Sequence, residues 1–263
     1  MDPINAATLG FIQGLAEWLP ISSTGHLRIA EILMGLTIPL LFDLILHLGT
    51  LIVVLLFFRN DLKNLIIALK RRDFNSEDGK LIPLIIVGTL PTALIGLVFG
   101  STVDLYFSSY LPIGSAFLVC GFVLFCSRVS NEKTDSISYF HALVIGTAQG
   151  IAIVPGISRS GFSISIALLL GIQRKKAFNF SFLLSIPTIV GALGLTFYEQ
   201  YEALSFAGIE IIHLFVGVAV SIIVGFVSLR FLRRMVIGKK FCLFAFYCWL
   251  LGSILLILSI SGF

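Results

Sequence analysis

The chain has 263 residues, of which 57% are hydrophobic and only 12% are charged, and its mean hydropathy is +1.04. A soluble domain carries about 25% charged residues, so this composition excludes an ordinary soluble enzyme and indicates an integral membrane protein. The formal net charge of +4 does not require a nucleic-acid partner, because the basic residues follow membrane topology.

Two kinds of apolar segment alternate along the chain. The regions 4–35 and 139–171 are apolar but interrupted by Pro, Gly and Ser. Six other runs are uninterrupted and long enough to cross a bilayer, for which a helix needs about 20 residues. These predicted spans are 40–58, 81–100, 111–127, 178–198, 211–229 and 241–262. The sequence therefore predicts an all-α, polytopic protein with a single membrane domain over 1–263.

Basic residues mark one side of the membrane. Sixteen of the eighteen Lys and Arg residues lie in four connections, at 59–80, 128–133, 174–176 and 230–240, whereas 101–110 and 199–210 have none. The positive-inside rule places the basic connections in the cytoplasm of a multi-pass protein of the cell (inner) membrane. We expect 59–80, with its mixed charges, to be a solvated loop. Region 139–171 then enters and leaves from the cytoplasmic face, and 4–35 from the outer face, as two re-entrant pairs of half-helices.

The two interrupted regions also resemble each other in sequence. Residues 10–25 and 146–161 are identical at seven of sixteen positions, including a Gln and an Ile-Ser pair in register. Each copy is followed by three predicted spans. We therefore predict an inverted-topology repeat, with halves 1–127 and 139–263, and a binding site where the interrupted segments meet.

Arg159 lies at the tip of the second interrupted region, in Pro155-Gly-Ile-Ser-Arg-Ser-Gly161. A buried Arg is costly and usually has a partner or a function. Its guanidinium suits phosphate oxygens, and a helix that starts after Pro155 and Gly156 would add backbone N–H groups. The alternative is a structural Arg bound to carbonyls of the broken helix.

The first interrupted region supplies an acid and several hydroxyls. Gln13 and Glu17 are four residues apart and share a helix face. A carboxylate at this depth requires a metal or a distant Arg, so Mg²⁺ or Ca²⁺ bridging Glu17 and a diphosphate is one reading. A structural ion pair with Arg159 is the other.

The residues that follow Glu17 suggest displacement at phosphorus. Ser22, Ser23 and Thr24 offer hydroxyls, although such a triplet is also a common helix cap, and His26 offers a base near neutral pH. A hydroxyl or water would attack, His26 would move the proton, and Arg159 with the metal would take the developing charge. The sequence leaves the nucleophile open between Ser23, His26 and water.

Two further pairs of residues are assigned minor roles. Asp43 and His47, four apart on the first span, are expected to support the site rather than to catalyse. Arg28 and Glu31 are expected to form a local helix pair.

At these residues the chain resembles the undecaprenyl-diphosphate phosphatases of the bacitracin-resistance type. That family carries Glu/Gln-x-x-x-Glu followed by Pro-x-Ser-Ser-Thr-Gly-His, matched by Gln13 to His26, and Pro-Gly-x-Ser-Arg-Ser-x-x-Thr, matched from Pro155 with Ser163 in place of the last Thr. The resemblance implies hydrolysis of a polyprenyl diphosphate to the monophosphate, a divalent metal and a site open to the outside, and it is compatible with a homodimer.

The resemblance also implies a set of site residues. The catalytic residues would be Glu17, Ser23, His26 and Arg159, the metal ligands Glu17 and Gln13, and the substrate-binding residues Ser22, Thr24, Ser158, Ser160 and Ser163.

Three other functions compete with this reading. Broken helices in an inverted repeat are typical of transporters, so a flippase of polyprenyl phosphate is the main alternative. A second type of membrane lipid phosphatase shares Gly-His and Ser-Arg, but this chain has no Lys-x6-Arg-Pro motif. A purely structural subunit would not need the buried Arg and Glu.

Overall fold

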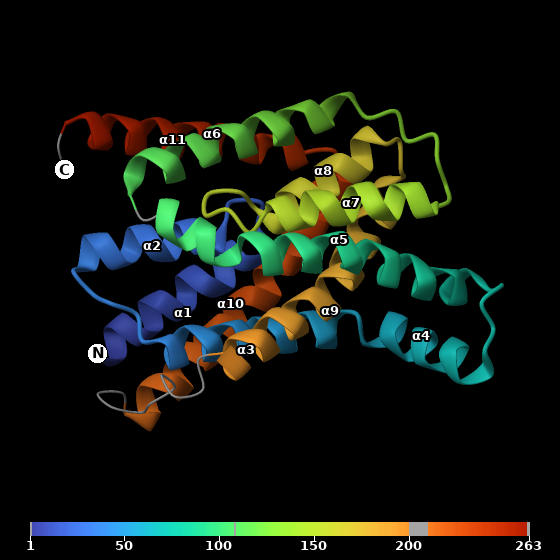
Figure 1. Ribbon diagram of the computed structural model, residues 1–263, viewed down its shortest axis with the longest axis horizontal. Helices are drawn as coiled ribbons and strands as arrows, with labels where there is room; N and C mark the ends of the chain where they lie inside the picture. The colour runs from blue at the N-terminus through green and yellow to red at the C-terminus, as the bar shows by residue number, and fades with distance from the viewer. Residues whose placement is uncertain (1, 108, 200–209, 262–263) are drawn as a thin grey trace.

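The computed structural model describes residues 2–107, 109–199 and 210–261, and in these ranges it contains helices and no β-strand (Figure 1). The α-helices are α1 Pro3–Trp18, α2 Ser23–Met34, α3 Leu40–Phe57, α4 Arg59–Arg71, α5 Glu77–Tyr106, α6 Tyr110–Cys126, α7 Tyr139–Ile151, α8 Arg159–Leu169, α9 Arg174–Glu199, α10 Ile211–Ile237 and α11 Phe244–Ile260. Short 3-10 turns lie at Ser127–Val129 and Phe241–Leu243.

Within the described ranges, six helical segments are long and apolar enough to cross a bilayer, which confirms the six predicted spans. They are Leu40–Phe57, Glu77–Gly100, Tyr110–Val129, Arg174–Glu199, Ile211–Ile237 and Phe241–Ile260. Large apolar side chains such as Leu94, Leu97 and Val98 remain exposed on the outside of α5, as expected for a surface that faces lipid. The chain is therefore a multi-pass membrane protein.

Two predictions about the basic connections were incomplete. Residues 59–80 are not a plain loop, because Arg59–Arg71 forms α4, whose Leu62 and Ala68 face the protein. The mixed charges of this stretch conceal the helical spacing of its apolar residues. Helix α10 also continues to Ile237, so Arg230 lies within a helix. Most of the connection 199–210, predicted to be outside, falls beyond the described residues.

The two interrupted regions form pairs of short helices, each broken by a turn. Leu19 to Ser22 separate α1 from α2, and Ala152 to Ser158 separate α7 from α8. Pro20 and Pro155 lie in these turns, and a proline cannot donate the backbone bond that would continue a helix. In each pair the Ser of the repeated Ile-Ser dipeptide caps the second helix, since Ser22 accepts from the Gly25 N–H and Ser158 from the Gly161 N–H. The repeated sequence thus forms the same local structure twice.

The helix pairs approach the middle of the molecule from opposite ends. In Figure 1, α1 runs inward from the end that holds the N-terminus, and α7 runs inward from the other end. Helix α1 packs against α10, and α7 packs against α5. At both contacts two glycines meet: the backbone of Gly217 leaves no room for a Cβ on Gly10, and that of Gly88 leaves none on Gly146. Small residues allow such close helix contacts within membranes.

Candidate functional site

Hydrogen bonds join the turns of the two helix pairs. The Ser22 hydroxyl accepts from the Gly156 N–H at 3.0 Å, in addition to capping α2. From the other side, the Ser160 hydroxyl donates to the Trp18 carbonyl at 2.8 Å, and that of Ser158 to the Leu19 carbonyl at 3.4 Å. The two motifs, far apart in the sequence, therefore form one structure at the centre of the protein.

Two residues at this junction have a backbone conformation with positive φ. Ser22 has φ 67° and Gly156 has φ 101°, both in the left-handed region. For Ser22, a residue with a side chain, this conformation costs on the order of 1–3 kcal/mol and persists only where its surroundings enforce it. The bonds that Ser22 makes to Gly25 and Gly156 supply that constraint.

Glu17 connects both motifs. Its side chain is 4% exposed, and Oε1 lies 3.5 Å from Nη2 of Arg159. The Ser23 hydroxyl donates to Oε2 at 2.6 Å, and the Gln13 amide donates to the same oxygen at 3.2 Å. The sequence predicted a partner for the buried carboxylate and one for the buried Arg, and the structure brings these two charges together.

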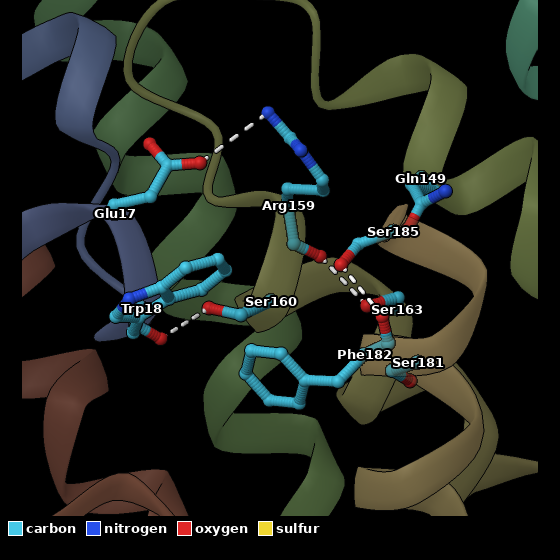
Figure 2. Close-up of a pocket in the computed structure, with 9 residues that line it drawn as sticks. All are labelled: Glu17, Trp18, Gln149, Arg159, Ser160, Ser163, Ser181, Phe182 and Ser185. Carbon is cyan, nitrogen blue, oxygen red and sulfur yellow. Dashed lines mark hydrogen bonds and ion pairs between the residues drawn. The ribbon is translucent and has the colours of Figure 1, made fainter. Parts of the chain in front are cut away.

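A small open pocket, with room for about one water molecule, lies between Glu17 and Arg159. Figure 2 shows that α8 and α9 present hydroxyls toward it, whereas α1 contributes Glu17 and Trp18. The lining residues are Glu17, Trp18, Gln149, Arg159, Ser160, Ser163, Ser181, Phe182 and Ser185. Oε1 of Gln149 and Oγ of Ser181 are buried and have no hydrogen-bond partner within the described part of the chain. The pocket thus combines the Arg159 cation with the unpaired Ser181 hydroxyl, both of which can donate to an oxyanion, whereas the unpaired Gln149 oxygen can only accept.

His47 also belongs to this site. Its Nε2 lies 3.9 Å from Oε2 of Glu17, and its Nδ1 lies 3.6 Å from a carboxylate oxygen of Asp43. Sequence reasoning gave His47 a supporting role, because its spacing from Asp43 was the only signal. The structure places it beside Oε2 of Glu17, whereas Arg159 contacts Oε1.

Comparison with known proteins identifies the family. A family model described as "Bacitracin resistance protein BacA" matches residues 6–254. The chain belongs to this family. Proteins named undecaprenyl-diphosphatase are among its relatives: that of Carboxydothermus hydrogenoformans is 39% identical over 100% of this chain and 99% of its own length. Those of Halothermothrix orenii and Methanosphaera stadtmanae are 40% and 37% identical, over 98% and 99% of this chain and 99% of each relative.

His26 lies apart from Glu17 in this BacA-family chain. Its Nδ1 is 2.8 Å from the Ser22 carbonyl and its Nε2 is 2.6 Å from the Tyr247 hydroxyl, while its ring stacks on Tyr247. Within the described residues no hydrogen bond or ion pair joins it to Glu17 or Arg159. Its role as proton carrier remains a prediction, and the group that contacts the Ser23 hydroxyl is Glu17.

The remaining predicted residues fall into two groups. Ser158, Ser160 and Ser163 lie at the start of α8, and the Ser163 hydroxyl donates to the Arg159 carbonyl at 2.8 Å. Ser160 and Ser163 line the pocket, whereas Ser158 serves as the cap. Thr24 is exposed and forms no side-chain hydrogen bond to any described residue.

Two side-chain oxygens near Glu17 are the candidates for a divalent cation. In the described ranges no group of three or more His, Cys, Asp or Glu is arranged to hold a metal. Oε1 of Gln13, however, is buried without a hydrogen-bond partner, next to the Glu17 carboxylate that its amide contacts. Mg²⁺ is commonly held by one or two protein oxygens together with water and substrate phosphates. Glu17 and Gln13 match that number, but the Gln13 amide turns its nitrogen toward Glu17, so its Oε1 would face a shared cation only after the amide turns over.

Proposed function

We propose that this protein hydrolyses a polyprenyl diphosphate of the undecaprenyl type to the monophosphate and inorganic phosphate. The observation that carries the proposal is the position of Glu17, which contacts both the Ser23 hydroxyl and the Arg159 guanidinium at a polar pocket. The relatives named undecaprenyl-diphosphatase support the same reaction and favour it over lipid transport.

Arg159 would bind the diphosphate. Its side chain is 33% exposed, so its guanidinium can contact Glu17 and still present donors to phosphate oxygens in the pocket. It is also the first residue of α8, whose N-terminal N–H groups and helix dipole favour an anion at this end. The unpaired Ser181 hydroxyl would donate to the remaining phosphate, and the unpaired Gln149 oxygen would accept from its water shell.

Ser23 is the proposed nucleophile, with Glu17 as its base. The Ser23 oxygen attacks the terminal phosphorus while its proton passes to Oε2 of Glu17, 2.6 Å away. The bond from this phosphorus to the bridging oxygen breaks, and polyprenyl monophosphate leaves. The monophosphate takes the proton from Glu17 as it leaves. Water then attacks the phosphoserine and gives a proton to Glu17. The bond from phosphorus to the Ser23 oxygen breaks, and this oxygen regains its proton from Glu17 as inorganic phosphate is released. Arg159 stabilises the charge on the phosphoryl oxygens in both steps.

A divalent cation, Mg²⁺ or Ca²⁺, would be held by Glu17 and by Oε1 of Gln13. When bound, it would neutralise charge on the diphosphate. Two predicted residues would act outside the pocket. Ser22 would join the two turns, and His26 would bind Tyr247 beside the start of α2. Thr24, which is exposed, lies outside the pocket as well.

The same proposal extends to the architecture. We infer that 1–127 and 139–263 are inverted repeats. The packing supports this, because the first helix of each half packs against a helix of the other half: α1 against α10, and α7 against α5. The basic connections support an orientation in the cell (inner) membrane with these connections in the cytoplasm.

The test is phosphate release from farnesyl diphosphate and undecaprenyl diphosphate by purified protein in detergent, with Mg²⁺ and with chelator. Arg159→Ala should reduce release to near background, because the pocket then lacks its only cation among the described residues. Arg28→Ala is the matched control, since Arg28 pairs with Glu31 at 3.0 Å on α2 and does not line the pocket. Equal activity of the two variants, or no release from either lipid by the wild type, would contradict the proposal.

A further inference from the structure

A second hollow lies where α3 meets α4, and it shares no lining residue with the Glu17 pocket. It is an open groove of about 440 Å³, lined by Leu55 on α3 and by residues of α4. The lining positions recur every three or four residues, so the hollow follows one continuous face across the break at Phe58.

Three cations line this hollow: Arg59, Lys63 and Lys70. All three are exposed, and none takes part in an ion pair or side-chain hydrogen bond with another described residue. The acid on α4, Asp61, is two positions from both Arg59 and Lys63, a spacing that does not place side chains on the same face of a helix. The positive charge of the hollow is therefore uncompensated.

Apolar side chains occupy the same face between the cations. Ile66 is 53% exposed, and Leu55 and Ile67 are each 37% exposed. Leu55 lies in the last turn of a membrane span, whereas α4 follows that span at the end with the basic connections, as its place at one end of Figure 1 shows. The hollow thus runs from acyl-chain depth to headgroup depth, with apolar groups and cations side by side.

We propose that this hollow binds one anionic phospholipid of the leaflet at the basic end of the protein. Arg59, Lys63 and Lys70 would contact the phosphate, and an acyl chain would lie against Leu55, Ile66 and Ile67. Charge complementarity selects this occupant. A second copy of the chain, related by a two-fold axis, would bring three cations against the same three cations, and a soluble anion would leave the apolar side chains unused.

The experiment is native mass spectrometry of the full chain in detergent, titrated with phosphatidylglycerol or with phosphatidylcholine of the same acyl chains. The variant Arg59→Gln/Lys63→Gln/Lys70→Gln removes the cations of the hollow. The matched control Arg71→Gln/Arg72→Gln/Lys80→Gln removes the same charge from the same connection but from positions outside the hollow. Phosphate release from farnesyl diphosphate reports whether each variant is folded, and Lys63→Gln alone provides a milder change.

One phosphatidylglycerol should bind the wild type and the control variant with similar affinity, and phosphatidylcholine should bind more weakly. Each cation near a membrane surface contributes about 1 kcal/mol to binding of anionic lipid, so the hollow variant should bind roughly a hundredfold more weakly and Lys63→Gln roughly fivefold. Equal weakening in the hollow and control variants, equal binding of both lipids, or a dimer that dissociates in the hollow variant would overturn the proposal.

Discussion

Replacement of Glu17 by Gln tests the centre of the proposed mechanism. The two side chains have nearly the same shape, but the amide can neither accept the Ser23 proton nor attract Arg159. General-base catalysis contributes on the order of 10²–10⁴-fold, and each tenfold corresponds to about 1.4 kcal/mol. Loss of the base should therefore raise the barrier by about 3–5 kcal/mol and reduce kcat by two to four orders of magnitude.

The same substitution should leave the fold intact. The amide at position 17 can still bond to Gln13 and Ser23, and Arg159, with a third of its side chain exposed, retains contact with water. The assay is kcat at saturating farnesyl diphosphate, with thermal melting of the same samples in detergent. A kcat within tenfold of the wild type, at an unchanged melting temperature, would refute the assignment of Glu17 as base.

Three further predictions concern neighbouring residues. Ser23→Ala should abolish both turnover and the phosphoenzyme that acid quenching traps from substrate labelled on its terminal phosphate; turnover that persists would indicate attack by water. Gln13→Glu adds a carboxylate beside Glu17 and should lower the Mg²⁺ concentration that protects the protein from thermal melting, and an unchanged Mg²⁺ dependence would contradict the ligand assignment. Gly156→Ala should destabilise the fold by about 1–3 kcal/mol, because φ is 101° and the new Cβ would lie 2.7 Å from the Ile113 carbonyl oxygen. Thermal melting in detergent measures this loss, and a wild-type melting curve would contradict the prediction.

The sequence predicted the spans well because the length and polarity of a segment largely decide whether it crosses a bilayer. Helix α4 was missed for the opposite reason. Its charges dominate its composition, and the short apolar stripe that includes Leu62 and Ala68 becomes visible only where it packs beside α5.

The site was predictable where charge was involved. Glu17 and Arg159 are costly to bury alone, so the sequence itself indicates that each requires a partner. The hydroxyls of Ser181 and Ser185 gave no such signal, because serine in a membrane helix is usually satisfied by a carbonyl of the preceding turn. Ser185 is bonded in this way to Phe182, whereas Ser181 is not bonded, and only the structure distinguishes them. The direction of the His26 ring, toward Tyr247, likewise depends on packing against α11.

The pairing of Glu17 with Arg159 also sets an order for biogenesis. During synthesis α1 emerges long before α8, and until α8 arrives the carboxylate has no guanidinium beside it. A lone charge deep in a bilayer costs several kcal/mol, so until then the carboxylate depends on Gln13, Ser23 and His47, which contact it from the first half of the chain. A nascent chain that ends before Arg159 would therefore lack the guanidinium that the site requires, and enzymatic competence would arise at a late stage of assembly.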